Sequence, residues 1–143
     1  MTMGKQLWML GLGLLAASAA GAADYAGSGV GAIPDNNANG LNVTFNTTGF
    51  QGPLGHVRVT LNLTHTFVGD LRGTLISPNG LARLVLFART GYKRAASPGV
   101  SANLAGAYVF DDLLGAVLWA SVAPLVTSQT VPSGSYRTST AGF

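Results

Sequence analysis

The chain has 143 residues, of which 48% are hydrophobic and 9% are charged, and this composition excludes wholesale disorder. The formal net charge of +3 is too small to indicate nucleic acid or an anionic membrane surface as the main partner. Cysteine is absent, which excludes disulfides and thiolate metal sites. These properties are typical of one small, weakly charged globular domain.

A cleavable signal peptide is predicted over residues 1–23. Lys5 provides a positive charge near the start, residues 7–17 are apolar and uncharged, and small residues follow up to the cleavage point after Ala22 or Ala23. An uncleaved membrane anchor needs about 20 apolar residues to span the bilayer core, and the apolar stretch here is shorter. We therefore predict export to the periplasm or the extracellular space, with no membrane attachment after cleavage.

The remaining residues, 24–143, are predicted to form one all-β domain. Residues 57–64 place an apolar side chain at every second position, which is the period of a strand with one buried face, and residues 41–45 repeat this alternation. Asn79-Gly80 is typical of a tight hairpin. Further candidate strands are 71–77, 82–87, 108–110 and 136–138, while residues 113–119 fit a helix turn or a strand. Many short strands with frequent turns predict an antiparallel sandwich or barrel.

Three stretches of the sequence resemble one known family. The first is Ile33-Pro34-Asp35, the second runs from His56 to Leu71 and on to the Ser-Pro-Asn-Gly turn at 77–80, and the third pairs residues 110–112 with 131–136. Together they resemble the P domain, or Homo B domain, of the proprotein convertases kexin and furin. The specific part of this resemblance is a structural motif that contains His65, Thr66, Gly69 and Asp70.

The resemblance implies a jelly-roll β-sandwich of about eight strands. It also implies a non-catalytic accessory domain that stabilises a subtilisin-like serine endopeptidase domain outside this chain. The chain departs from the family pattern because it follows a leader directly, without a preceding protease. It also reaches Phe143 before the family's closing Gly-x-Trp strands. We therefore expect an incomplete domain, a fragment of a longer protein.

Two candidate calcium sites follow from the distribution of oxygen ligands. Asp35, Asn37 and Asn39 occupy the first, third and fifth positions of a D-x-N-x-N-G pattern, but the twelfth position is Asn46, where a calcium loop of the EF-hand type has Glu. An Asx-rich turn explains the same residues without calcium. Asp111 and Asp112 form a weaker candidate, because two adjacent carboxylates repel each other unless a cation or an arginine lies nearby.

No catalytic residue is predicted. The mature chain has no Gly-x-Ser-x-Gly nucleophile motif, and we interpret His65 with Asp70 as a packed corner that follows a strand. An alternative function is a free-standing jelly roll that binds a carbohydrate or a cell-surface partner. It requires an exposed aromatic platform, for which the candidates are Tyr92, Trp119 and Tyr136.

Overall fold

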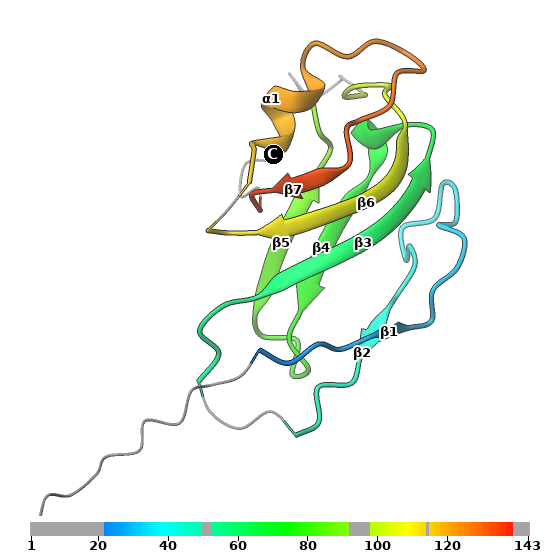
Figure 1. Cartoon of the computed structure of the whole chain (residues 1–143). Coiled ribbons are helices and arrows are strands. Elements are labelled where there is room, and N and C mark those ends of the chain that lie inside the picture. Colours follow the sequence, from blue (N-terminus) through cyan, green and yellow to red (C-terminus); the bar gives the residue numbers. More distant parts are fainter. Residues whose placement is uncertain (1–21, 50–52, 92–97, 114, 139–143) are drawn as a thin grey trace, which may run out of the picture. The chain divides into compact units, whose positions relative to one another are not determined.

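The computed structural model describes residues 22–49, 53–91, 98–113 and 115–138 (Figure 1). The contacts divide the chain into two units, residues 1–53 and residues 54–143. In the first unit, β1 (Gly27–Ser28) pairs antiparallel with β2 (Thr44–Phe45). The strand predicted over residues 41–45 is thus reduced to its last two residues, because β1 pairs with Thr44 and Phe45 alone among the described residues.

The longer sheet of the second unit has the strand order β3-β6-β7, formed by β3 (Arg58–His65), β6 (Leu104–Asp111) and β7 (Gly134–Tyr136). β3 and β6 pair antiparallel over their full lengths, from Arg58 opposite Asp111 to His65 opposite Leu104. β7 pairs parallel with β6. The alternation in residues 57–64 is confirmed as a strand, and the strand predicted over residues 108–110 extends further toward the N-terminus.

The second sheet is a hairpin of β4 (Arg72–Ile76) and β5 (Arg83–Ala88), with an irregularity in the register after Gly73. Its turn is wider than the tight Asn-Gly hairpin predicted from the sequence, because six residues separate the two strands. Gly80 has a φ of 72°, and the Ser77 hydroxyl donates to the side-chain oxygen of Asn79 at 2.7 Å. Hydrogen bonds of these side chains within the turn therefore provide partners for its polar groups.

The two sheets form a sandwich, with β4 and β5 as a second layer behind β3 and β6 in Figure 1. The core between them contains buried residues from both layers, among them Val59, Phe87, Tyr108, Phe110 and Tyr136. The all-β, largely antiparallel fold predicted from the sequence is therefore confirmed. The jelly-roll order of the strands stays a prediction, since the described strands of this unit form a three-stranded and a two-stranded sheet.

Two short helices complete the second unit: the 3₁₀ turn η1 (Val68–Asp70) and α1 (Leu118–Val122). The ambiguous segment 113–119 thus ends in the start of a helix, whose Leu118 and Val122 are buried. In the part of the chain that the structure describes, no helix has both the length and the apolar character needed to cross a membrane.

Candidate functional site

The buried carboxylate of Asp111 lies at the end of the sandwich where β3 begins and β6 ends. Asp111 is the last residue of β6, lies opposite Arg58 in the strand register, and is only 1% exposed. The Nε of Arg58 donates to Asp111 Oδ2 at 3.1 Å, and the backbone N–H of Leu113 donates to Oδ1 at 2.8 Å. The carboxylate therefore has a charged partner on the neighbouring strand and a backbone donor in the turn that follows it.

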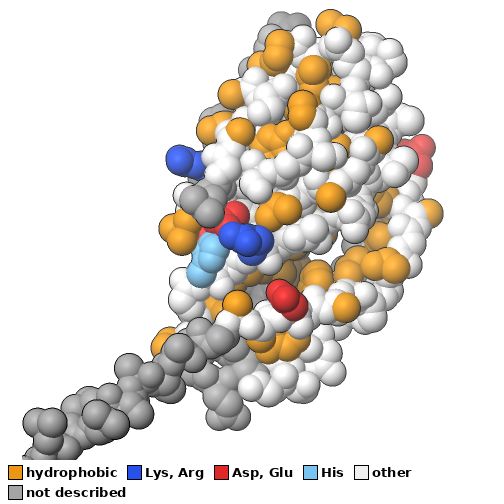
Figure 2. Space-filling view, viewed as in Figure 1, with side chains coloured by type: hydrophobic (Ala, Val, Ile, Leu, Met, Phe, Trp, Pro, Cys, Tyr) orange, Lys and Arg blue, Asp and Glu red, His pale blue; other side chains and the backbone are white. Residues whose placement is uncertain are grey.

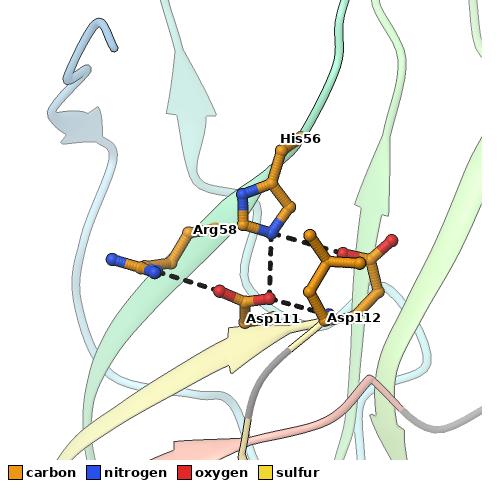
Figure 3. A network of polar contacts seen from close by, with 5 residues as sticks. His56, Arg58, Asp111 and Asp112 are labelled. Carbon is orange, nitrogen blue, oxygen red and sulfur yellow. Dashed lines mark hydrogen bonds and ion pairs between the residues drawn. The ribbon is translucent and has the colours of Figure 1, made fainter.

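His56 joins this network from the segment that leads into β3 (Figure 3). Its Nε2 lies 2.9 Å from Oδ1 of Asp111 and 3.4 Å from Oδ1 of Asp112. The side chain of Asp112 is 59% exposed, whereas that of His56 is 34% exposed. Two carboxylates, one buried and one exposed, thus converge on a single imidazole nitrogen.

Figure 2 shows a histidine, a basic side chain and an acidic side chain that lie against one another on this face of the molecule, where most of the visible side chains are uncharged. In the described part of the chain, one group of three potential metal ligands of the His, Cys, Asp and Glu types is present, namely His56, Asp111 and Asp112. Their ligand atoms all lie within 4.8 Å of one another.

The chemistry that this arrangement supports is the binding of a proton or a cation. A base–nucleophile pair requires a hydroxyl or thiol hydrogen-bonded to the imidazole. Among the described residues, no serine or threonine hydroxyl makes a hydrogen bond to His56, whose partners are Asp111 and Asp112. The adjacent carboxylates of the weaker candidate calcium site therefore share His56, and Asp111 also pairs with Arg58.

The second histidine lies in the predicted structural motif, at the other end of β3. His65 Nδ1 accepts a hydrogen bond from the backbone N–H of Phe67 at 3.1 Å and lies 3.8 Å from Asp70 Oδ1. Gly69 passes so close to the neighbouring loop that a Cβ there would lie 2.6 Å from the carbonyl oxygen of Pro98. The motif therefore forms a tight corner, in which Thr66 separates β3 from the turn.

The predicted calcium loop lies in the first unit as an exposed turn. The side-chain oxygen of Asn37 accepts the backbone N–H of Asn39 at 2.9 Å, which is the hydrogen bond of an Asx turn. Asp35 is exposed, and Asn36 adopts a positive φ of 47°. Turn geometry thus accounts for these residues, and calcium at Asp35, Asn37 and Asn39 stays a prediction.

The aromatic platform of the carbohydrate-binding alternative is incomplete. Tyr136 is only 4% exposed and packs its ring in the core, so it is not available to a sugar. Trp119 is partly buried, and its indole nitrogen makes no hydrogen bond to any residue that the structure describes. Tyr92 lies outside the described residues. Tyr136 is the last residue of β7, which pairs with β6, and its ring lies near those of Tyr108 and Phe110.

Sequence reasoning did not identify His56 or Arg58 as members of a site. The charge of Arg58, at a polar position of the alternating strand, was the available signal for a site. Its partner on β6, however, is defined only by the strand register.

Comparison with known proteins gave one match. Neither the curated proteins nor the solved structures contain a protein that matches the chain. Residues 54–104, which run from the approach to β3 as far as the first residue of β6, match the family model of the proprotein convertase P-domain and confirm the resemblance found in the sequence.

Proposed function

We propose that this chain is an exported accessory domain that binds to and stabilises a subtilisin-like serine endopeptidase domain encoded outside the chain. Domains of this family are non-catalytic and accompany the catalytic domains of proteases. The observation that carries the proposal is the match over residues 54–104, which include β3, β4, β5 and the corner of the structural motif.

Three features of the chain support the proposal. The leader with Lys5, an apolar stretch and small residues supports export. The closely packed sandwich supports a rigid module, and rigid surfaces bind partners without a large ordering cost. Large apolar side chains at the surface of the second unit include Leu81, which is 86% exposed, and Leu113, which is 65% exposed. Exposed apolar side chains of this kind can supply part of the apolar contact area of a protein interface.

The experiment that tests this function measures the stability of a protease domain rather than catalysis by this chain. The whole chain is mixed with a separately expressed subtilisin-like catalytic domain from the same organism. We expect the melting temperature of the catalytic domain to rise with the concentration of the chain, because a ligand that binds only the native state stabilises it. The turnover number of each intact active site is expected to stay unchanged.

Two controls make the result decisive. A chain unfolded by Gly69→Val is expected to give no stabilisation, since the new side chain meets the backbone of Pro98 and Val100. The folded chain alone is expected to cleave no peptide substrate and to react with no serine-directed reagent. The accessory function is refuted if the folded chain at saturating concentration leaves the stability of every subtilisin-like domain of that organism unchanged.

A further inference from the structure

Two carboxylates, those of Asp111 and Asp112, converge on one nitrogen of His56. A neutral imidazole has one N–H to share between Asp111 and Asp112. Among the described residues, Arg58 pairs with Asp111 and not with Asp112, so a bound cation would give Asp112 a positive partner. A pair of adjacent carboxylates is stable when an opposite charge lies within a few ångströms.

We propose that His56, Asp111 and Asp112 bind a divalent transition-metal ion of the zinc class. The ligands are Nε2 of the imidazole and one oxygen of each carboxylate. This inference is independent of the accessory function, because it concerns a site within the second unit that no step of protease stabilisation requires.

The distances from Nε2 of His56 to the two carboxylate oxygens agree with a tetrahedral site. Zinc–nitrogen and zinc–oxygen bonds of about 2.0–2.1 Å at tetrahedral angles separate ligand atoms by about 3.3 Å. The separations of Nε2 from the two carboxylate oxygens are 2.9 Å and 3.4 Å, one on either side of this value. The two carboxylate oxygens lie within 4.8 Å of each other, so the exposed side chain of Asp112 has to rotate toward the ion, and water completes the fourth position.

The groups around the three ligands hold them in suitable orientations. Arg58 and the backbone N–H of Leu113 both donate to Asp111, which fixes the buried carboxylate in the way that ligand carboxylates are usually held. Nδ1 of His56 makes no hydrogen bond among the described residues and can carry the ring proton while Nε2 binds the ion. The exposed side chain of Asp112 leaves the ion a path from solvent.

The donor set favours zinc over calcium. Calcium prefers six to eight oxygen ligands, whereas this corner offers one nitrogen and carboxylate oxygens from two residues. Imidazole together with carboxylate is a donor set that zinc accepts. The positive charge of Arg58 opposes the ion and predicts moderate affinity rather than the tight binding of a closed structural site.

The experiment is a calorimetric titration of the untagged, chelator-treated whole chain with ZnCl₂, followed by a parallel titration with CaCl₂. We expect saturable binding of one Zn²⁺ per chain, and at least tenfold weaker binding in His56→Ala and in Asp112→Asn. Both side chains are partly exposed, so these variants are expected to fold, which circular dichroism checks. The matched control is His65→Ala, which removes the other histidine, at the opposite end of β3. This variant is expected to bind Zn²⁺ like the parent chain.

A second readout distinguishes inner-sphere binding from general attraction to negative charge. Co²⁺ added in place of Zn²⁺ is expected to give the intense visible absorption of a tetrahedral site, and His56→Ala is expected to lose it. The proposal is overturned by the absence of saturable Zn²⁺ binding, by equal binding in His56→Ala and His65→Ala, or by binding of Ca²⁺ without Zn²⁺. A protonated imidazole that merely bridges the two carboxylates gives the first of these results.

Discussion

The ring of Phe87 in β5 stacks on the ring of Phe110 in β6, with the ring centroids 5.1 Å apart and the ring planes inclined by 19°. One residue belongs to the two-stranded sheet and the other to the three-stranded sheet, so this contact joins the two layers of the sandwich. Gly73 lies opposite Phe87 in the register, and a Cβ there would meet the Phe87 ring at 2.7 Å. The absence of a side chain at Gly73 thus leaves space for the stack.

Truncation of Phe110 tests this contact between the layers. Phe110→Ala is expected to lower the free energy of unfolding by about 3–5 kcal/mol, because it removes a fully buried ring and leaves a cavity beside Phe87. Chemical denaturation monitored by circular dichroism measures the change. Leu81→Ala is the control, since a side chain that is 86% exposed is expected to change stability by less than about 0.5 kcal/mol. Equal effects of the two substitutions contradict the assigned core.

The close approach at Gly69 gives a second prediction. Gly69→Ala places a Cβ about 2.6 Å from the backbone of Pro98 and Val100, neither of which can move without disturbing the loop. We expect a loss of about 1–3 kcal/mol, the range of overpacking in a filled interior. Gly55→Ala is a matched control, because a Cβ at Gly55 meets no atom within 4 Å. Equal denaturation midpoints for the two variants exclude a tight corner at the structural motif.

The alternation of apolar residues identified β3 because that pattern depends on one buried face, which is a local property of the strand. The first half of β6 was not identified, because Ala105, Gly106 and Ala107 have weak strand propensity and form a strand through their pairing with β3. Tertiary pairing, rather than the local sequence, determines this part of the fold.

The candidate site illustrates the same limit. The sequence indicated that Asp111 and Asp112 require a nearby cation or arginine, and the structure provides Arg58 and His56. The identity of these partners depends on the register between two strands that are separated by about fifty residues, and no local pattern specifies that register. The corner at His65 was accessible to sequence reasoning, because its members are close together in the chain.

The buried carboxylate gives the third prediction. Asp111→Asn is expected to cost about 2 kcal/mol, because the amide NH₂ replaces an acceptor and faces either the Arg58 donor or the N–H of Leu113. Denaturation is measured in the presence of a chelator, so that metal binding makes no contribution. Asp112→Asn serves as the control, with an expected change below about 0.5 kcal/mol for its exposed side chain. A larger loss for Asp112→Asn than for Asp111→Asn contradicts the assigned network.

The fourth prediction concerns the stability of the domain in alkali and the raised pKa of Tyr136. Burial raises the pKa of its hydroxyl above the ordinary value, the nearby Tyr108 adds to this increase, and a hydrogen bond from Ser121 opposes it. The hydroxyl also donates to the carbonyl of Pro132 at 2.5 Å. In the unfolded chain Tyr136 loses its proton near pH 10, before it does so in the folded state. The free energy of unfolding is therefore expected to fall as the pH rises from about 10 through the folded-state pKa.

Tyr136→Phe provides the comparison, because it keeps the ring and removes the titrating group together with the hydrogen bond to Pro132. The variant is expected to be less stable than the parent chain at neutral pH, where the lost hydrogen bond costs about 1 kcal/mol. Above pH 10 the parent chain is expected to lose stability more steeply, because it has the Tyr136 phenol, whose pKa is raised in the folded state, and the variant lacks it. Denaturant midpoints recorded from pH 8 upward measure both trends. Parallel midpoint curves for the two proteins show that Tyr136 ionises equally in both states and refute the role of its burial.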